Sequence, residues 1–281
     1  MPELPEVETM CRGIGGVAGQ IITGVSFPRR TRRPILISPP AGRLAKRLIG
    51  SRIDAVERAG KRGVLRLAGA AADEPERLVI EPRMTGLLLR VPPPSDVHVR
   101  MVLKFAEHPP LIFWDRRGLG TIRLLTNEEF YRRCGPSVLG PDALTLAGAA
   151  FHSAIHHSRR PIKQALLDQR VTAGIGNIYA AEILFAAGLD PRSRCCRISR
   201  AECNTIATVT RKILRRAIRL EGSSIGDETY RTADSRPGRY QRCHQVYGRA
   251  GAACPRCGAI IRRIVQAQRS TFFCPGCQRR K

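Results

Sequence analysis

Met1-Pro2-Glu3-Leu4-Pro5-Glu6 opens the chain and begins the helix around which the rest of the sequence is organised. An initiator methionine is commonly removed when the next residue is small, so we expect Pro2 to expose a free secondary amine. An amine with a nearby proton shuttle, here Glu3 or Glu6, is the minimal equipment for covalent attack on a masked carbonyl carbon. The product would be an iminium, which stays positively charged and acts as an electron sink. The simpler alternative for these six residues is an ordinary capped helix with acidic residues in its first turn.

The residues that follow support a helix. Pro5 suits the first turn, where its missing N–H costs nothing. Apolar side chains then recur at helical spacing and glycines end the segment, so we expect one buried helical face close to the N-terminus. The apolar positions are Leu4, Val7, Cys11 and Ile14, and the glycines are Gly13, Gly15 and Gly16.

The composition indicates a polyanionic partner. Lys and Arg number 48 against 23 Asp and Glu in 281 residues, a formal net charge of +25. A solvated surface does not require this imbalance, and nucleic acid explains it better than a membrane surface does. No apolar run reaches about 18 residues, the length that spans a bilayer, and the acidic N-terminus lacks the basic and apolar run of a secretory signal. We therefore expect a cytoplasmic protein with no membrane partner, long enough for two domains.

Four of the ten cysteines form two Cys-x-x-Cys pairs, Cys254 with Cys257 and Cys274 with Cys277, separated by sixteen residues. This spacing is typical of a four-cysteine zinc ribbon, in which each pair sits on a tight turn and two thiolates converge on one ion. The protein would fill all four tetrahedral positions, so the Zn²⁺ would be structural and would activate no water. An iron–sulfur centre is the alternative for the same ligands. The other six cysteines show no disulfide framework, which fits a reducing cytoplasm.

Short strands dominate residues 20–125. The stretch 98–105 alternates apolar and polar residues, turns at 107–110 and returns through 111–114, which predicts a β-hairpin. Several short runs punctuated by Pro and Gly favour a sandwich or barrel, with the N-terminal helix in front of its core. The other expected strands are 20–27, 53–57, 64–67, 78–80 and 86–91, and residues 44–49 are expected to form a short helix.

The second half of the chain is helical in pattern. Thr126 can cap a short helix that contains Glu129, and the Gly- and Pro-containing residues 134–142 then connect the two domains. Ser199 and Glu202 form a capping box that opens a long helix. Its predicted buried face carries Ile206, Val209, Ile213, Ala217 and Leu220, and basic residues lie largely around it. Two shorter helices are expected at 161–168 and 178–187.

The turn between the two shorter helices, Gly174-Ile175-Gly176-Asn177, is a candidate phosphate site. Glycines allow a close backbone approach, and the N–H groups at a helix start bind phosphate. Asn177 is placed to cap the helix that follows, and a purely packing role for this turn is the alternative. Between the cysteine pairs, residues 267–273 are expected to form a hairpin with Arg269 near its tip, where an arginine is most simply a phosphate contact. With the charge of the chain, both features favour binding of the DNA backbone.

Together these motifs resemble those of the formamidopyrimidine-DNA glycosylase family, whose fold is shared by the endonuclease VIII-like enzymes. They occur in the family's order and cover nearly the whole chain. Leu4 favours the formamidopyrimidine branch, because glycine is common at that position in the other branch. The motifs are residues 2–9, Gly60-Lys61-Arg62-Gly63, Met84-Thr85-Gly86, Leu139-Gly140-Pro141, 174–180, Val246-Tyr247-Gly248-Arg249 and 268–272, together with the cysteine pairs.

The resemblance implies a two-domain α+β fold. An N-terminal β-sandwich with an N-terminal helix would be followed by a C-terminal helix–two-turn–helix domain with a four-cysteine zinc finger. The expected boundaries are 1–135 for the catalytic domain, 136–240 for the helical DNA-binding domain and 241–281 for the zinc finger. Double-stranded DNA containing oxidised bases or abasic sites would lie in the cleft between the domains, and the protein would act as a monomer.

The resemblance also implies a bifunctional DNA glycosylase and AP lyase for oxidised purines such as 8-oxoguanine and formamidopyrimidines. Pro2 would attack the sugar C1′, release the base and form a Schiff base, and Glu3 would be the general acid/base that opens the sugar ring. Glu6 would help to hold the helix start and the proton network. Lys61 would act as proton donor in the β-elimination, and Arg269 would assist the δ-elimination by gripping phosphate.

Five further positions are implied to contact DNA. An enzyme that acts on a base must take it out of the stack, and wedge residues usually fill the gap. Met84 and Arg117 match the family's wedge methionine and arginine. Leu119 stands where the family usually has phenylalanine, and leucine stacks less well, so the opposite-base discrimination is open. Lys163 and Asn177 would bind the backbone that flanks the lesion.

Two other departures from the family concern residues close to the DNA. Glu81-Pro82-Arg83 replaces the usual His-Leu-Gly before Met84, so a histidine contact is lost and a cation is gained. Asp96 stands where the family often has a DNA-contacting histidine, and an aspartate repels phosphate, so that contact is not expected here. These changes leave the chemistry intact and the lesion range open.

Two alternative functions therefore stand beside the first. One is an endonuclease VIII-like glycosylase for oxidised pyrimidines. The other is a non-catalytic damaged-DNA-binding protein that kept the fold. The joint presence of Pro2, Glu3, Glu6 and Lys61 argues against the binder, because binding DNA needs none of them.

Overall fold

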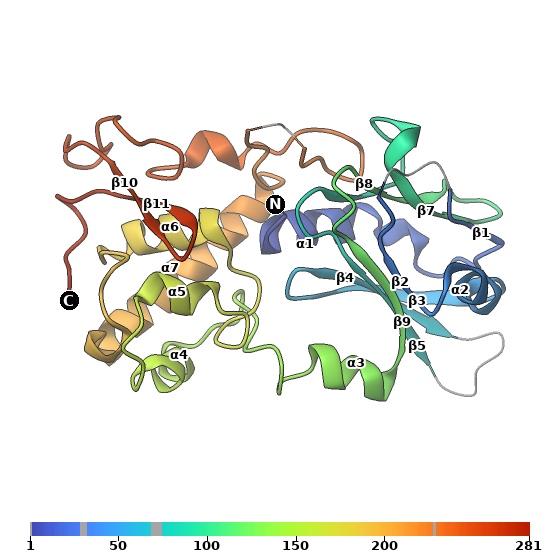
Figure 1. Ribbon diagram of the computed structural model, residues 1–281, viewed down its shortest axis with the longest axis horizontal. Helices are drawn as coiled ribbons and strands as arrows, with labels where there is room; N and C mark the ends of the chain where they lie inside the picture. The colour runs from blue at the N-terminus through green and yellow to red at the C-terminus, as the bar shows by residue number, and fades with distance from the viewer. Residues whose placement is uncertain (1, 29–32, 69–74, 227–228) are drawn as a thin grey trace. The chain divides into compact units, whose positions relative to one another are not determined.

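A computed structural model of the chain describes residues 2–28, 33–68, 75–226 and 229–281 (Figure 1). The expected removal of Met1 concerns a residue outside these ranges. The chain forms two compact units. The N-terminal unit comprises Met1–Gly135 with Leu220–Arg239, and the C-terminal unit comprises Pro136–Arg219 with Tyr240–Lys281. The segment Leu220–Arg239 thus belongs to the N-terminal unit, whereas the boundaries expected from the sequence place it with the helical domain.

Long-range hydrogen bonds explain why Leu220–Arg239 joins the N-terminal unit. The backbone N–H of Ser223 donates to the carboxylate of Glu6 at 2.8 Å. The backbone N–H of Arg90 donates to the carbonyl of Ala233 at 3.0 Å, and its guanidinium donates to Asp234 at 2.5 Å. Sequence patterns report local periodicity, so they give no sign of partners that lie more than a hundred residues apart.

The described part of the N-terminal unit contains two β-sheets. Their strands are β1 (Gly24–Ser26), β2 (Leu36–Ser38), β3 (Arg52–Ala59), β4 (Arg62–Ala68), β5 (Glu76–Glu81), β6 (Gly86–Leu89), β7 (Val99–Lys104), β8 (Leu111–Asp115) and β9 (Thr121–Thr126). One sheet has the order β1-β7-β8-β6 and the other has the order β2-β9-β5-β4-β3. All neighbours are antiparallel except β2 and β9, which run parallel. The predicted hairpin is present as β7 and β8, with Val102 opposite Ile112.

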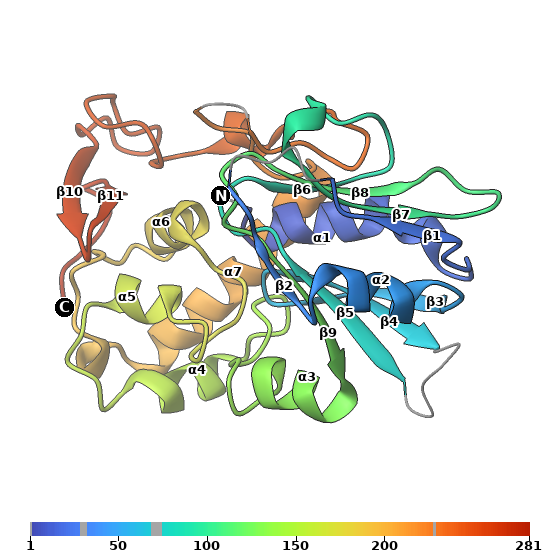
Figure 2. The same cartoon turned by 45° about the vertical axis from the view of Figure 1, so that its right-hand side comes forward.

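Helix α1 (Leu4–Gly13) lies between the two sheets (Figure 2). It packs against β3 and β4 of one sheet and against β6 of the other. The predicted apolar face is confirmed, because Leu4, Val7, Cys11 and Ile14 are all at most 6% exposed. Each buried aliphatic side chain contributes about 1.5–3 kcal/mol, whereas a helix of ten residues is marginal alone. The core therefore holds the helix and fixes the position of the residues at its start.

Shorter helices complete the N-terminal unit. They are the α-helices α2 (Ala41–Leu48) and α3 (Asn127–Cys134) and the 3₁₀ turns η1 (Gly15–Val17) and η2 (Asp96–His98). The predicted cap of α3 is present. The N–H of Glu129 donates to the Thr126 hydroxyl at 3.2 Å, and the N–H of Thr126 donates to the Glu129 carboxylate at 3.1 Å.

The described C-terminal unit is built from four α-helices and one hairpin. The helices are α4 (Gly148–Ile155), α5 (Ile162–Leu167), α6 (Asn177–Ala186) and α7 (Arg200–Arg219), with 3₁₀ turns η3 (Cys195–Arg197) and η4 (Tyr240–Cys243) and strands β10 (Arg262–Gln266) and β11 (Arg269–Phe273). The predicted capping box of α7 is confirmed, since the N–H of Ser199 donates to Glu202 at 2.8 Å and the N–H of Glu202 donates to the Ser199 hydroxyl at 3.2 Å.

The buried face of α7 differs in part from the predicted one. Val209 and Ile213 are only half-buried. The face that packs against α4 and α6 combines aliphatic side chains with small ones. The buried residues are Cys203, Ile206, Ala207, Thr210, Leu214, Ala217 and Ile218. Among the residues that the structure describes, no helix is long and apolar enough to cross a membrane.

Candidate functional site

The start of α1 gathers the candidate nucleophile and two acids. Pro2 is buried, and Glu3 and Glu6 are each 1% exposed. One oxygen of the Glu6 carboxylate, Oε2, accepts the N–H of Glu3 at 2.9 Å, and the other, Oε1, accepts the N–H of Ser223 at 2.8 Å. Burying carboxylates is costly unless hydrogen bonds compensate. The two backbone bonds offset that cost for Glu6 and hold its side chain in one orientation beside the N-terminal residues.

The segment that meets Glu6 depends on a glycine that the sequence analysis did not single out. Gly222 has a φ of +77°, and a Cβ at this position would lie 2.8 Å from Oε1 of Glu6. Tyr230 holds the same segment, because its hydroxyl donates to the carbonyl of Glu221 at 3.0 Å. Burial, together with the charge of Glu6, raises the pKa of Tyr230 well above its ordinary value, so the phenol stays protonated and remains a donor.

Lys61 lies on the turn between β3 and β4, where Gly60 adopts a φ of +58°. A chain of ionic contacts fastens this turn to α1. Arg58 donates to Glu8 at 2.8 Å through Nε and to the carbonyl of Gly60 at 2.8 Å through Nη1. Burial tends to raise the pKa of Glu8, but hydrogen bonds from Arg58 and Arg12 outweigh it, so the pKa lies below its ordinary value. Glu8 is therefore charged near neutral pH. Its ion pair with Arg58 holds the turn that carries the half-buried Lys61.

The three candidate wedge residues come from two neighbouring turns. Met84 is half-buried in the turn between β5 and β6, whereas Arg117 is exposed and Leu119 half-buried in the loop after β8. The hydroxyl of Thr85 accepts the N–H of Arg117 at 2.9 Å. This bond joins the turn of Met84 to the loop of Arg117 and Leu119.

At Glu81-Pro82-Arg83, where the sequence departs from the family pattern, the new cation Arg83 is paired with an acid. Arg83 is exposed, with a φ of +54°, and its Nε lies 3.5 Å from the carboxylate of Glu81. Arg62 lies 3.6 Å from the same carboxylate. The added acid thus neutralises part of the charge that the added arginine brings. Asp96, the other departure, is exposed in η2.

In the C-terminal unit, two candidate DNA-binding residues converge on the zinc-finger hairpin. Lys163 of α5 is 1% exposed, and its Nζ donates to the hydroxyl of Thr271 at 2.6 Å and to the carbonyl of Ser270 at 3.1 Å. The amide of Asn177 donates to the same carbonyl at 3.0 Å. The expectation that Asn177 caps α6 is wrong, because the helix begins with Asn177 itself and the preceding glycine is its N-cap.

Arg269 lies beside this contact and is exposed. The hairpin turns at Ala267 and Gln268, which have φ values of +47° and +60°, so Gln266 pairs directly with Arg269. Positive φ at both turn residues is the geometry of a type I′ hairpin. The predicted hairpin is therefore present, with Arg269 as the first residue after its tip. Its guanidinium can reach an anion in solution.

The four candidate zinc ligands form one cluster. The Sγ atoms of Cys254 and Cys277 lie 3.8 Å apart, those of Cys257 and Cys274 lie 3.4 Å apart, and all four fall within 4.8 Å of one another. A tetrahedral zinc with Zn–S bonds of about 2.3 Å requires Sγ–Sγ distances of about 3.8 Å. The four thiols therefore fit one structural Zn²⁺ with no position left for water.

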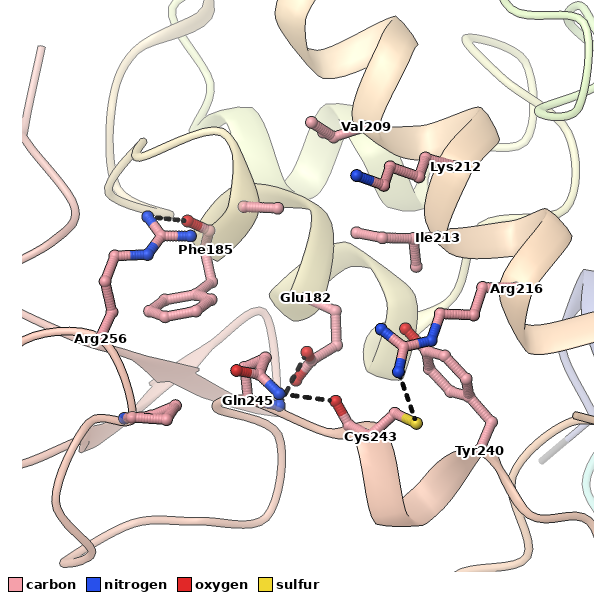
Figure 3. Close-up of a pocket in the computed structure, with 12 residues that line it drawn as sticks. Glu182, Phe185, Val209, Lys212, Ile213, Arg216, Tyr240, Cys243, Gln245 and Arg256 are labelled. Carbon is pink, nitrogen blue, oxygen red and sulfur yellow. Dashed lines mark hydrogen bonds between the residues drawn. The ribbon is translucent and has the colours of Figure 1, made fainter.

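A cavity of about 540 Å³ lies in the C-terminal unit between α6, α7, η4 and the first turn of the zinc finger (Figure 3). Its lining includes none of the candidate site residues that the structure describes. Glu182, its one acidic residue, accepts the N–H groups of Gln245, Val246 and Tyr247 at 2.9–3.0 Å. Burial raises the pKa of Glu182, and these three donors oppose the rise. The Val246-Tyr247-Gly248-Arg249 motif thus anchors the zinc finger to α6.

Three family models match the chain. Residues 1–122 match the N-terminal domain of formamidopyrimidine-DNA glycosylase, and residues 139–229 match its H2TH domain. Residues 251–280 match a zinc finger found in FPG and IleRS, which identifies the cysteine cluster as a zinc site rather than an iron–sulfur centre. An N-terminal unit that buries Pro2 and two acids, combined with a helical unit and this finger, defines a DNA-repair glycosylase with a zinc finger. The chain belongs to the formamidopyrimidine-DNA glycosylase family.

Full-length relatives agree with the family models. The formamidopyrimidine-DNA glycosylase of Cereibacter sphaeroides is 38% identical over 289 residues, covering 99% of this chain and 100% of that protein. Two solved structures of Lactococcus lactis FPG are also similar, each covering 99% of this chain and 100% of that one. A variant in complex with DNA containing Fapy-dG is 33% identical with a TM-score of 0.86. The wild type in complex with DNA containing an oxidised pyrimidine is 31% identical with a TM-score of 0.85.

Proposed function

We propose that the protein excises oxidised purines, 8-oxoguanine and formamidopyrimidines, from double-stranded DNA and cleaves the strand at the resulting abasic site. The observation that carries this proposal is the burial of Pro2 beside Glu3 and Glu6 at the start of α1. A buried pair of acids next to an N-terminal amine costs stability and contributes nothing to holding DNA. It supports covalent chemistry at the amine, in which the acids carry protons.

In the proposed reaction, the nitrogen of Pro2 forms a bond to C1′ of the lesion nucleotide as the bond from C1′ to the base breaks. The amine loses its proton, and the departing base gains one. Glu3 protonates O4′ as the sugar ring opens, which leaves an iminium between Pro2 and C1′. Glu6 keeps the N-terminal residues in place through its bonds to the N–H groups of Glu3 and Ser223.

Strand cleavage follows from the same iminium, which acidifies the hydrogen on C2′. Loss of that proton expels the 3′ phosphate in a β-elimination, for which Lys61 is the proposed proton donor. A second, δ-elimination expels the 5′ phosphate, and Arg269 is proposed to grip phosphate during this step. Water then hydrolyses the remaining iminium and releases Pro2. The zinc of the finger takes no part in these steps, because its four ligands are the cysteines.

Lesion-containing DNA is the proposed partner, and the protein is proposed to act on it as a monomer at the nucleoid, in the cytoplasm. The formal charge of +25 supports a polyanionic partner. The Lactococcus lactis structures were determined with damaged DNA, which supports the same partner. Asn177 and Arg269 are the proposed phosphate-side contacts of the C-terminal unit, and the buried Lys163 is proposed to support them by holding Ser270 and Thr271. Met84, Arg117 and Leu119 are the proposed wedge.

A second candidate, excision of oxidised pyrimidines, rests on a specific observation. A relative with the same fold was solved with DNA that contains an oxidised pyrimidine. The departures at residues 81–83 and at Leu119 lie in the turns that carry the proposed wedge. The two candidates share one chemistry and differ in which base enters the site.

Borohydride trapping tests the proposal. The protein, with removal of Met1 checked by mass spectrometry, is incubated with duplexes containing 8-oxoguanine, a formamidopyrimidine or thymine glycol, and borohydride reduces the iminium to a stable adduct. We expect adducts with the purine lesions to form fastest, and Pro2→Gly to slow both base release and strand cleavage. Faster trapping with thymine glycol would favour the second candidate. No adduct with any of the three duplexes would contradict an enzymatic function.

A further inference from the structure

Asp115, the last residue of β8, is buried with an exposed fraction of 0%. Among the described residues, its carboxylate accepts four hydrogen bonds. Oδ1 accepts the hydroxyl of Thr85 at 2.5 Å and the N–H of Arg117 at 3.2 Å. Oδ2 accepts the N–H of Leu119 at 2.8 Å and that of Gly120 at 2.7 Å. One carboxylate therefore fixes the loop after β8 at three backbone positions and joins it to the residue that follows Met84.

A second buried ion reinforces this arrangement. Arg100 of β7 is 4% exposed, and its Nε and Nη2 donate to the carbonyl of Asp115 at 2.9 and 2.7 Å. Its Nη1 donates to the carbonyl of Arg33 at 2.6 Å. Burial lowers the pKa of Arg100, and the charge of Asp115 opposes that decrease. Two buried opposite charges with satisfied hydrogen bonds form a stable set only while both remain, since removal of one leaves the other uncompensated.

The loop itself is built to reach the carboxylate. Gly118 adopts a φ of +62°, a conformation that favours glycine. A Cβ at Gly120 would lie 2.6 Å from the ring of Phe113 and 3.1 Å from Oδ2 of Asp115. A side chain at position 120 would push the backbone away from the carboxylate. The sequence Asp115-Arg116-Arg117-Gly118-Leu119-Gly120 thus specifies one loop conformation.

We propose that Asp115 is a positioning residue for base eversion, holding the turn of Met84 and the loop of Arg117 and Leu119 as one rigid wedge. The proposal rests on the wedge role given to these three residues under the proposed function. Asp115 takes its hydrogen bonds from backbone N–H groups and from Thr85, so the wedge side chains are held through their backbone. Unstacking a base costs a few kcal/mol. A wedge offsets this cost best when its turns are already rigid, because they then lose little conformational entropy on entering the duplex.

Asp115→Asn tests the proposal, because the amide keeps the size of the side chain but replaces one acceptor oxygen with an NH₂ donor that would face the donors of the loop. Eversion is measured from the fluorescence of 2-aminopurine placed beside a tetrahydrofuran abasic analogue in a duplex, which requires no chemistry. We expect the eversion rate to fall about tenfold, as for loss of charge-assisted hydrogen bonds. Borohydride trapping on a single-stranded abasic oligonucleotide needs no eversion and should stay within about twofold of wild type. Asp54→Asn, which removes the same charge from an exposed ion pair on β3, should change neither readout.

Thr85 provides a second test in case Asp115→Asn is poorly folded. Thr85→Val removes the hydroxyl that joins the two turns and keeps the shape of the side chain, whereas Thr85→Ser retains the hydroxyl. We expect slower eversion with valine and near-normal eversion with serine. If Thr85 served stability alone, the valine variant would melt at a lower temperature. Its activity would then fall equally on duplex and on single-stranded substrates.

The outcomes distinguish this inference from the proposed function. Wild-type eversion in folded Asp115→Asn and Thr85→Val would overturn the positioning role. Equal losses on duplex and single-stranded substrates would overturn it as well, because eversion would not be the affected step. If wild-type protein everts the base but forms no borohydride adduct, the proposed chemistry fails, and the 2-aminopurine comparison still decides the role of Asp115.

Discussion

The N–H of Ser223 donates to Oε1 of Glu6 at 2.8 Å, although 217 residues separate the two in the sequence. The other oxygen of the same carboxylate accepts the N–H of Glu3 at 2.9 Å. Glu6 therefore connects the residues next to the candidate nucleophile to the segment Leu220–Arg239. A single side chain determines both where the N-terminus lies and where this late segment meets it.

Glu6→Gln should disturb both ends of that connection. A carboxamide has one acceptor oxygen and one NH₂ donor. The backbone N–H of either Glu3 or Ser223 would therefore face the NH₂ group of the glutamine and lose its acceptor. An unsatisfied buried donor costs about 1–3 kcal/mol, and we expect thermal unfolding at a lower temperature and slower borohydride trapping. Glu128→Gln, at an exposed position in the first turn of α3, is the matched control and should behave as wild type. Unchanged trapping and stability in Glu6→Gln would show that the connection is dispensable.

Arg269→Ala should weaken DNA binding through charge alone, because the side chain is exposed. Each phosphate that a protein neutralises contributes about −0.9 to the slope of log affinity against log salt on duplex DNA. We expect the slope of Arg269→Ala to be smaller in magnitude by about that amount, with the same change on damaged and undamaged duplexes. Fluorescence anisotropy over a salt series measures the slope. Arg200→Ala, at the exposed start of α7, is the control, and equal slopes for all three proteins would remove Arg269 from the proposed interface.

Local signals made much of this molecule predictable. The apolar spacing of Leu4, Val7, Cys11 and Ile14 identified the face of α1 that the sheets bury. Reciprocal capping residues marked the starts of α3 and α7, because a capping box is formed within four residues. The two Cys-x-x-Cys pairs fixed the zinc site for the same reason: the spacing of the ligands is written in the sequence.

Contacts between distant residues were not predictable. Asp115 ends an apolar strand directly before two arginines, and nothing local shows that Thr85 meets its carboxylate. Asn177 illustrates how a local rule fails, since its amide donates to Ser270 of the hairpin at 3.0 Å instead of capping the helix. Asn177 is the first residue of α6 rather than the residue before it, so its side-chain oxygen does not accept the N–H groups that a cap would satisfy. Lys163 gave no local signal for its buried bond to Thr271.

Cys274→Ser should remove the metal from the finger. Cys274 is buried, and its Sγ lies 3.4 Å from that of Cys257, so loss of this thiolate opens the tetrahedral set. Binding of a structural zinc is folding free energy for such a finger, and we expect zinc content to fall from one ion per chain toward none, with loss of DNA affinity. Cys196→Ser, at an exposed free cysteine of the same unit, should keep both. Elemental analysis of the purified proteins decides, and unchanged zinc in Cys274→Ser would contradict the ribbon.

His244 should make the C-terminal unit sensitive to mild acid. Burial lowers the pKa of His244 from 6.5 to about 4, so in mildly acidic solution the unfolded chain takes up a proton that the folded chain does not. Its contribution to stability is therefore complete above pH 6.5 and is lost progressively as the pH falls toward 4. Between pH 7.5 and pH 5 the loss is about 2 kcal/mol by linkage. Denaturant unfolding at the two pH values measures it, and His244→Gln should lose less by about that amount. Carboxylates with lowered pKa values, such as Glu8 and Asp190, titrate below this window and do not contribute to the loss. An equal loss in both proteins would show that a group other than His244 is responsible.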